Sequence, residues 1–344
     1  MRSRIVEGLP PLPVEGDDPD EPTQQRLEAG MIDACREVGT MLVRDGNIAQ
    51  GWMYLRPVGD TAAAREAMAD VEVTDDNAED MIGVLLHEGV DVARGYRAML
   101  ERNGTCNAIT IYEQSVRRRG RADRIAAAGI LLEHLHDELR NAVAADVRRR
   151  GGQAGDDASL NELLDANPEL MKSGGYHMDT THIASVVGIS RVLEERRHLE
   201  TARSLCRYGR SLDASFQYPG EEPFRDFYPS HHAYFSTLLG DDVDAGLRYF
   251  RDRARSVDPE VAGPGAIETY VELLDRVGRH AESVRATVEM TPAGVPAGPV
   301  VATMLPVVRR AEVAGQEGAP EMLAEFCRSR GDSIGYAAVM LDGG

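Results

Sequence analysis

Two imidazoles and one carboxylate stand within six residues of this sequence, at His177, Asp179 and His182. Imidazole nitrogens and carboxylate oxygens are ligands that zinc and iron prefer in proteins. A second pair, His231 and His232, follows later in the chain. If the two segments meet, these residues predict a site for a divalent metal such as Zn, Fe or Mn, with the chemistry of a hydrolase or a lyase.

The candidate bases for such a metal site are Glu133 and Asp137, which lie in a segment with two further histidines. His134 and His136 are about 200° apart on a helix, because each residue turns it by roughly 100°. One helix therefore cannot present both rings to the same ion.

The same two segments also have a structural explanation as the starts of helices. Asp179 precedes a regular apolar run and is a residue type that caps helix N-termini. His177 and His182 are too far apart in sequence to share one face of a helix. Ser230 has the capping position before the double histidine. Capping is therefore favoured over metal binding for both segments.

The elements that position these residues are helices throughout. Apolar residues recur with a period of about 3.6 residues in almost every segment, whereas the two-residue alternation of strands is almost absent. Between residues 24 and 42 one apolar stripe contains Leu27, Met31, Ile32, Cys35, Val38 and Leu42. The sequence therefore predicts an all-α protein.

A decapeptide pattern occurs three times in the chain. Each copy begins with an N-cap residue and a β-branched apolar residue, has glycine four positions after its start, and continues with large apolar residues. Glycine at this position lets a neighbouring helix approach closely. The copies are Asn47–Arg56, Asp91–Leu100 and Asp242–Arg251, with Gly51, Gly95 and Gly246 at the shared position.

This pattern resembles the second helix of tetratricopeptide repeats, which opens with a Gly-Asp or Gly-Asn turn before a small residue and paired large apolar residues. Gly46-Asn47 and Gly240-Asp241 are such turns. The copies do not follow the 34-residue period of the family, and glycine stands where alanine is usual. What the resemblance implies is an irregular α-solenoid, or α-α superhelix of helical hairpins, with a concave groove for a partner.

Composition divides the chain into an arm and two helical regions. Residues 1–22 are acidic and rich in proline, which predicts a flexible, exposed arm. Gly, Asp, Asn and Ser are frequent between residues 150 and 175, which predicts a linker. We therefore expect an N-terminal helical-repeat region over 23–155 and a C-terminal one over 156–344.

The stretch 213–230 cannot be one continuous helix because it contains Pro219, Pro223 and Pro229. It is rich in aromatic residues, and long ordered loops are often functional. We expect it to form one wall of a ligand pocket. The candidate ligand-binding residues are Tyr176, Phe216, Tyr218, Phe224 and Tyr228.

Charge and cysteine content exclude several kinds of partner. The net charge of -19, from 57 acidic against 38 basic residues, opposes binding to nucleic acid. No apolar run approaches the roughly 18 residues that cross a membrane. The four cysteines are scattered, as is typical of a reducing cytoplasm. These properties predict a cytoplasmic protein without nucleic-acid or membrane partners.

The sequence contains no P-loop, dinucleotide-binding fingerprint or HExxH motif. It therefore favours a helical-repeat binding protein whose groove takes a protein, a peptide or a small polar ligand. The alternative is a metal-dependent hydrolase or lyase with a His/Asp site in the same groove. The oligomeric state is left open.

Overall fold

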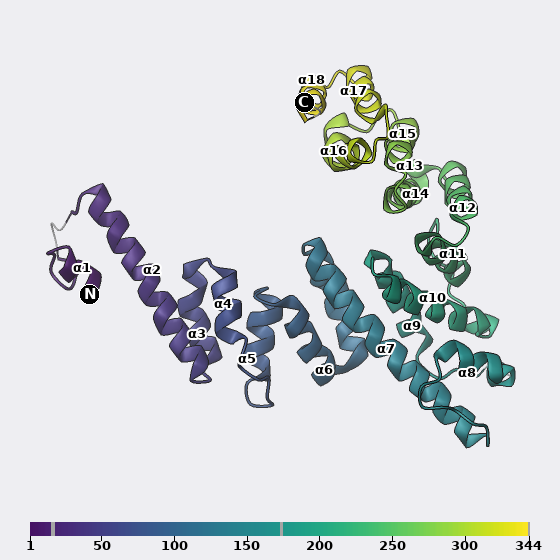
Figure 1. The fold of residues 1–344 in the computed structure, drawn as a ribbon, viewed down its shortest axis with the longest axis horizontal. Coiled ribbons are helices and arrows are strands. Elements are labelled where there is room, and N and C mark those ends of the chain that lie inside the picture. The colour runs from purple at the N-terminus through teal and green to yellow at the C-terminus, as the bar shows by residue number, and fades with distance from the viewer. Residues whose placement is uncertain (15–17, 173–174, 343–344) are drawn as a thin grey trace. The chain divides into compact units, whose positions relative to one another are not determined.

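The computed structural model describes residues 1–14, 18–172 and 175–342. Within these ranges the chain forms helices joined by turns, and the β structure there is one isolated bridge between Pro219 and Asp226. The predicted all-α fold is therefore confirmed. The residues divide into two compact units, 1–131 and 132–344, each of which can be followed in Figure 1.

The first unit is a series of helices of very different lengths. They are α1 (Arg2–Val6), α2 (Glu21–Arg44), α3 (Ile48–Leu55), α4 (Thr61–Met68), α5 (Ala78–Ile82) and α6 (Val92–Gln114). A π-helical turn, Gly83–His87, precedes α6, and α6 itself is interrupted at Gly104, whose φ is 76°. The buried core joins α2, α3, α4 and the π-helical turn, through residues such as Val43, Ile48, Met68 and Leu85.

The division between the units falls inside α7 (Arg121–Arg149). The second unit continues with α8 (Leu160–Ala166), α9 (Thr180–Ile189), α10 (Arg196–Ser211), α11 (Phe227–Leu239), α12 (Val243–Ser256), α13 (Pro259–Ala262), α14 (Gly265–Arg276), α15 (His280–Met290), α16 (Ala297–Val313), α17 (Ala319–Ser329) and α18 (Ser333–Asp342). From α10 onward each long helix packs mainly on its neighbours in sequence, as Figure 1 shows. The core of this unit therefore follows the chain from one pair of helices to the next.

The repeated glycines lie where their helices touch the preceding element. A Cβ built on Gly51 in α3 would lie 2.5 Å from the Val43 side chain in α2. One built on Gly95 in α6 would lie 2.6 Å from the backbone nitrogen of Leu86 in the π-helical turn. Both distances are far shorter than van der Waals contact, so only glycine fits without movement.

The third copy behaves in the same way, since a Cβ on Gly246 in α12 would overlap the Thr237 hydroxyl of α11. Two of the three predicted N-caps also form. The carboxylates of Asp91 and Asp242 accept hydrogen bonds from backbone N–H groups of α6 and α12, whereas the Asn47 side chain makes no such bond. The predicted close approach at the repeated glycine is confirmed in all three copies.

The expected arm and linker both contain regular structure. Residues 1–22 include α1, and an ion pair of 2.8 Å joins Glu7 to Arg26 of α2. The expected linker, 150–175, includes α8 and a 3-10 turn, Pro168–Met171, while residues 173–174 lie outside the described residues. The division into units falls at residues 131–132, whereas the sequence suggested a boundary near 155.

The aromatic stretch 213–230 becomes helical earlier than its prolines suggest. α11 begins at Phe227 and has Pro229 in its first turn, where a missing backbone N–H costs no helical hydrogen bond. Ser230 is therefore inside the helix and buried, with its hydroxyl 2.7 Å from that of Tyr249. The prediction that Ser230 caps this helix is wrong.

Candidate functional site

Asp179 is the N-cap of α9, as its sequence position predicts. One carboxylate oxygen accepts hydrogen bonds from the backbone N–H and the hydroxyl of Thr181, at 2.8 and 2.7 Å. These bonds from Thr181 hold the pKa of the Asp179 carboxyl below its ordinary value. The carboxylate thus satisfies backbone groups at the start of a helix. His182 lies half-buried in the following turn.

His177 is held in a polar network between α7 and α10. Its backbone N–H donates to the Tyr208 hydroxyl at 2.9 Å, and that hydroxyl lies 3.0 Å from the ring Nδ1. The ring Nε2 is 3.3 Å from Asp146 of α7. The His177 ring therefore bridges the Tyr208 hydroxyl of α10 and the Asp146 carboxylate of α7.

Asp146 is the charged end of this network. Burial of the carboxyl raises its pKa, but hydrogen bonds from Arg150, Arg149 and His177 outweigh that effect and lower the pKa to about 2. Arg150 forms an ion pair of 2.8 Å with this carboxylate, and Arg149 pairs with it as well. Arg149, the last residue of α7, and Arg150 directly after it therefore stabilise a buried anion.

His231 lies in the aromatic core of the second unit. Its Nδ1–H donates to the Phe227 carbonyl at 2.8 Å, and its ring stacks on Phe224 at a centroid distance of 4.2 Å. Its Nε2 is buried without a hydrogen-bond partner among the described residues. Burial lowers the pKa of His231 to about 3, with a smaller contribution from the charge of Arg191. This ring is a neutral packing group.

His232, on the next position of α11, is half-buried, and burial together with the nearby arginines Arg210, Arg203 and Arg207 lowers its pKa. In the ranges that the structure describes, no group of three His, Cys, Asp or Glu side chains is placed to hold a metal ion. The residues proposed as metal ligands are thus used separately, in a cap, in a buried network and in an aromatic core.

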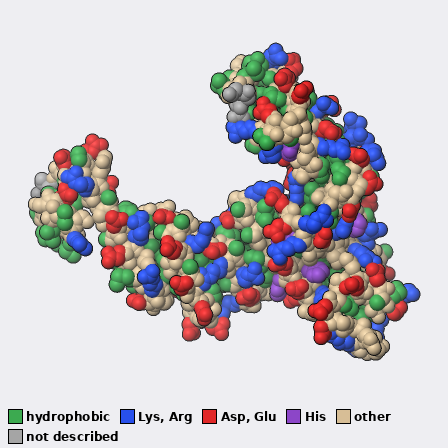
Figure 2. Space-filling model, in the orientation of Figure 1, with side chains coloured by type: hydrophobic (Ala, Val, Ile, Leu, Met, Phe, Trp, Pro, Cys, Tyr) green, Lys and Arg blue, Asp and Glu red, His purple; other side chains and the backbone are tan. Residues whose placement is uncertain are grey.

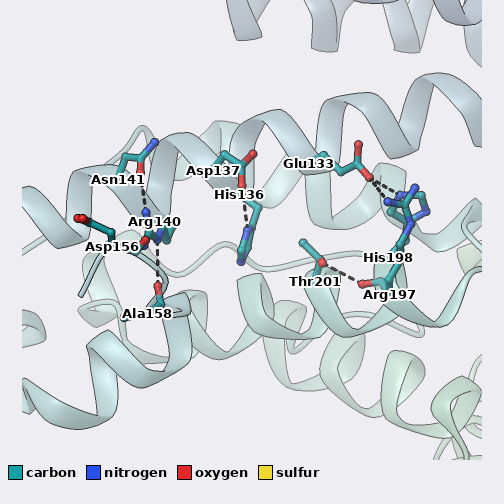
Figure 3. A network of polar contacts seen from close by, with 10 residues as sticks. All are labelled: Glu133, His136, Asp137, Arg140, Asn141, Asp156, Ala158, Arg197, His198 and Thr201. Atoms are coloured by element: carbon teal, nitrogen blue, oxygen red, sulfur yellow. Dashed lines mark hydrogen bonds and ion pairs between the residues drawn. The ribbon is translucent and has the colours of Figure 1, made fainter. Parts of the chain in front are cut away.

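The candidate bases of α7 contact α10 and their own neighbours. The Glu133 carboxylate lies 3.0 Å from both the His198 Nε2 and an Arg197 guanidinium nitrogen (Figure 3). Asp137 is 3.7 Å from the His136 ring, one residue before it. Glu133 therefore joins α7 to α10 through an ion pair with Arg197 and a hydrogen bond with His198.

The aromatic candidates divide into a surface pair and core residues. The rings of Tyr176 and Phe216 are 5.0 Å apart, and Tyr176 is 57% exposed. The Tyr218 hydroxyl lies 2.9 Å from that of Thr180. Phe224 and Tyr228 are buried, at 4% and 0% exposure. Their ligand-binding role stays a prediction, and the two buried rings pack within the protein.

A groove of about 830 Å³ lies elsewhere in the second unit, along α14, α15 and α16. Its floor is mainly apolar, because the buried hydroxyls of Ser283 and Thr287 donate to backbone carbonyls. The apolar side chains of Ile267, Met290 and Val300 are only half-buried. An opening of this size falls within the range of about 300 to 1,000 Å³ typical of ligand sites. The groove is therefore large enough to take several apolar side chains.

The edge of the groove is mainly acidic. Its lining includes four carboxylates, those of Glu260, Glu268, Glu272 and Asp275, against the single guanidinium of Arg310. Asp275 is bound to Arg310 at 2.7 Å. Glu260 and Glu268 are exposed beside the apolar floor. The local charge is thus negative, as it is for the whole chain.

The connection between α15 and α16 forms part of the groove wall. Residues 291–296 join α15 to α16 and contain two prolines, of which Pro292 lines the groove. The Arg330 guanidinium donates to the carbonyls of Thr291, Pro292 and Val295, at 3.1, 3.0 and 3.3 Å. These bonds fix the connection at the groove wall. Sequence reasoning missed the groove, although its prolines and glycines between residues 291 and 299 are a visible signal.

Figure 2 shows acidic and basic side chains spread over the visible face of the molecule. No helix of the described residues combines the length and the apolar character that crossing a bilayer requires. No family model, curated protein or solved structure matches this chain. The geometry of the chain's own residues therefore carries the functional argument.

Proposed function

We propose that this protein binds a short segment of a partner protein in the groove along α14, α15 and α16, and that the segment is apolar on one side and basic on the other. The observation behind the proposal is the combination of an apolar floor and an acidic edge in a groove of about 830 Å³. Apolar side chains would enter the floor, and lysine or arginine would meet the exposed carboxylates.

The helical framework supports the same proposal. The second unit packs helix on helix along the chain, and the glycine contacts repeat in both units. We include in the proposal an irregular α-solenoid of hairpins, similar to tetratricopeptide repeats, whose usual role is to present a groove. The four free cysteines suit the reducing cytoplasm as its location.

Binding is favoured over catalysis at this place because the floor is mainly apolar and the hydroxyls of its Ser283 and Thr287 already donate to backbone carbonyls. Asp275 is the most buried of the four lining carboxylates. It already contacts Arg310 and His280, at 2.7 Å each. The exposed carboxylates of Glu260 and Glu268 are well placed for charge recognition. The side chains considered as metal ligands lie in separate contacts within the described residues.

The test uses two synthetic amphipathic helical peptides that share one apolar leucine face and differ only in having lysine or glutamate on the polar face. The full chain should bind the lysine peptide more tightly, and added salt should weaken that binding. Fluorescence anisotropy of the labelled peptides measures both dissociation constants. Equal affinity for the two peptides would contradict the proposed charge preference.

Matched variants locate the binding. Val300→Asp places an unpaired carboxylate on the groove floor and should weaken binding about tenfold, or about 1.4 kcal/mol. Val313→Asp on the same helix is the control, because Val313 is 91% exposed and outside the groove lining. Glu268→Lys should weaken binding more than Glu289→Lys, an equal charge change on an exposed residue outside the lining. Equal effects within each pair would move the site elsewhere.

A further inference from the structure

Helix α2 has an apolar face that its own unit leaves exposed. Five apolar residues follow each other at alternating spacings of four and three, and they are referred to below as the α2 seam. Met31, Val38 and Met41 of this seam are 60%, 39% and 59% exposed. Leu27 is half-buried and Ala34 is exposed. The α2 seam consists of Leu27, Met31, Ala34, Val38 and Met41.

The α2 seam is distinct from the face of α2 that packs on α3. The helix has 24 residues, yet its buried residues are Gly39 and Val43, close to the hairpin with α3. At roughly 100° per residue, the seam covers an arc of about 80°, and Gly39 and Val43 lie about 120° and 160° from its centre. The core of the unit therefore does not explain why the seam is apolar.

The short helix α1 lies beside the α2 seam but does not cover it. It contacts α2 at Gly30, where an added Cβ would touch the Ser3 side chain, and through the ion pair of Glu7 with Arg26. Even with α1 in place, the side chains of Met31, Val38 and Met41 remain exposed. Large apolar side chains exposed along one line of a helix mark an interaction surface.

We infer that the α2 seam is a homodimerisation surface and that its occupant is α2 of a second copy of this chain. Alternating spacings of four and three give the 3.5-residue repeat by which two helices pack along a seam. A lipid surface does not fit, because α2 has four acidic residues against three arginines, whereas helices that bind anionic membranes are rich in Lys and Arg.

A second copy fits the seam because identical patches meet across a two-fold axis. None of the five seam residues is charged, so pairing the seam with itself places no like charges against each other. Ala34 at the centre allows close approach of the helices, and the methionines on either side adapt to each other's shape. This inference is independent of the groove on α14, α15 and α16.

The experiment is analytical ultracentrifugation of the full chain over a concentration range of about 1 to 100 µM, where weak dimers form and dissociate. The wild type should shift from monomer to dimer mass across this range. The double variant Met31→Lys, Val38→Lys should stay monomeric, with a dissociation constant at least about tenfold weaker. Both residues are exposed, so the fluorescence of Trp52 should report unchanged folding.

The control is Ala29→Lys, which adds the same charge to an exposed residue on the opposite face of α2. This variant should dimerise like the wild type. A wild-type chain that stays monomeric at all concentrations would overturn the inference and would leave another partner or another part of this chain as the occupant. Dimerisation of the double variant with wild-type affinity would also overturn it.

Discussion

The glycine contact in the first unit makes a direct prediction for Gly95→Ala. The new methyl group would lie 2.6 Å from the Leu86 backbone nitrogen, 2.8 Å from the Leu86 Cβ and 2.9 Å from the Leu85 Cβ. None of these atoms is the far end of a flexible side chain. The helix α6 must therefore move away from the π-helical turn, or the turn must deform.

The expected cost follows from two opposing terms. Overpacking of a well-packed contact costs about 1 to 3 kcal/mol, and a clash with backbone belongs near the upper end of that range. Alanine gains about 1 kcal/mol over glycine in helix propensity. We therefore expect Gly95→Ala to lower the free energy of unfolding of the first unit by about 2 kcal/mol.

Urea unfolding followed by tryptophan fluorescence measures this loss, because Trp52 is the single tryptophan of the chain and packs against the core of the first unit. Gly83→Ala is the matched control in the same unit, since nothing lies within 4 Å of a Cβ built on Gly83. That variant should be neutral or more stable than the wild type. If Gly95→Ala were as stable as Gly83→Ala, the close-packing explanation of the repeat would be wrong.

Two predictions concern pH. Burial lowers the pKa of His231 in the folded protein to about 3, from an ordinary 6.5. Its contribution to the free energy of unfolding is therefore complete above pH 6.5 and is lost as the pH falls toward 3. The variant His231→Phe should reduce this loss, measured as the urea midpoint of the second unit by circular dichroism. Burial raises the pKa of Asp146, but the bonds from Arg150, Arg149 and His177 lower it to about 2, from an ordinary 3.8. The contribution of Asp146 should therefore be present above pH 3.8 and be lost toward pH 2, and an Asp146→Asn variant that kept the wild-type decline below pH 4 would contradict this.

Local chemistry was sufficient to predict the helices and several of their starts. The 3.6-residue period identified the helical class, and Asp91, Asp179 and Asp242 cap helices as their positions predicted. These features depend on residues a few positions apart, so a single sequence contains the necessary information. The shared glycine position was predictable for the same reason, because the pattern itself repeats.

Contacts between distant residues were not predictable in this way. Ser230 has a good capping residue type, but α11 starts three residues earlier, and the Ser230 hydroxyl contacts Tyr249 of the next helix. His177 gained Asp146 and Tyr208 as partners from two other helices. The closeness of the histidines in sequence suggested a shared metal site. In the folded chain His177 and His231 instead make separate contacts.

The groove lies where the chain departs from its own pattern of close helix contacts. In α15 the small residue Ser283 still ties the helix to α14, since its hydroxyl donates to the Val271 carbonyl at 2.9 Å. The connection 291–296 then replaces a tight hairpin turn by a proline-containing segment, whose carbonyls accept hydrogen bonds from Arg330 in the turn between α17 and α18. Close packing on one side of α15 and a fixed wider connection on the other leave apolar side chains uncovered between α14 and α16. The prolines and glycines between residues 291 and 299 mark the irregular connection in the sequence. The size of the space depends on how far apart three helices are held, which residues close in sequence do not determine.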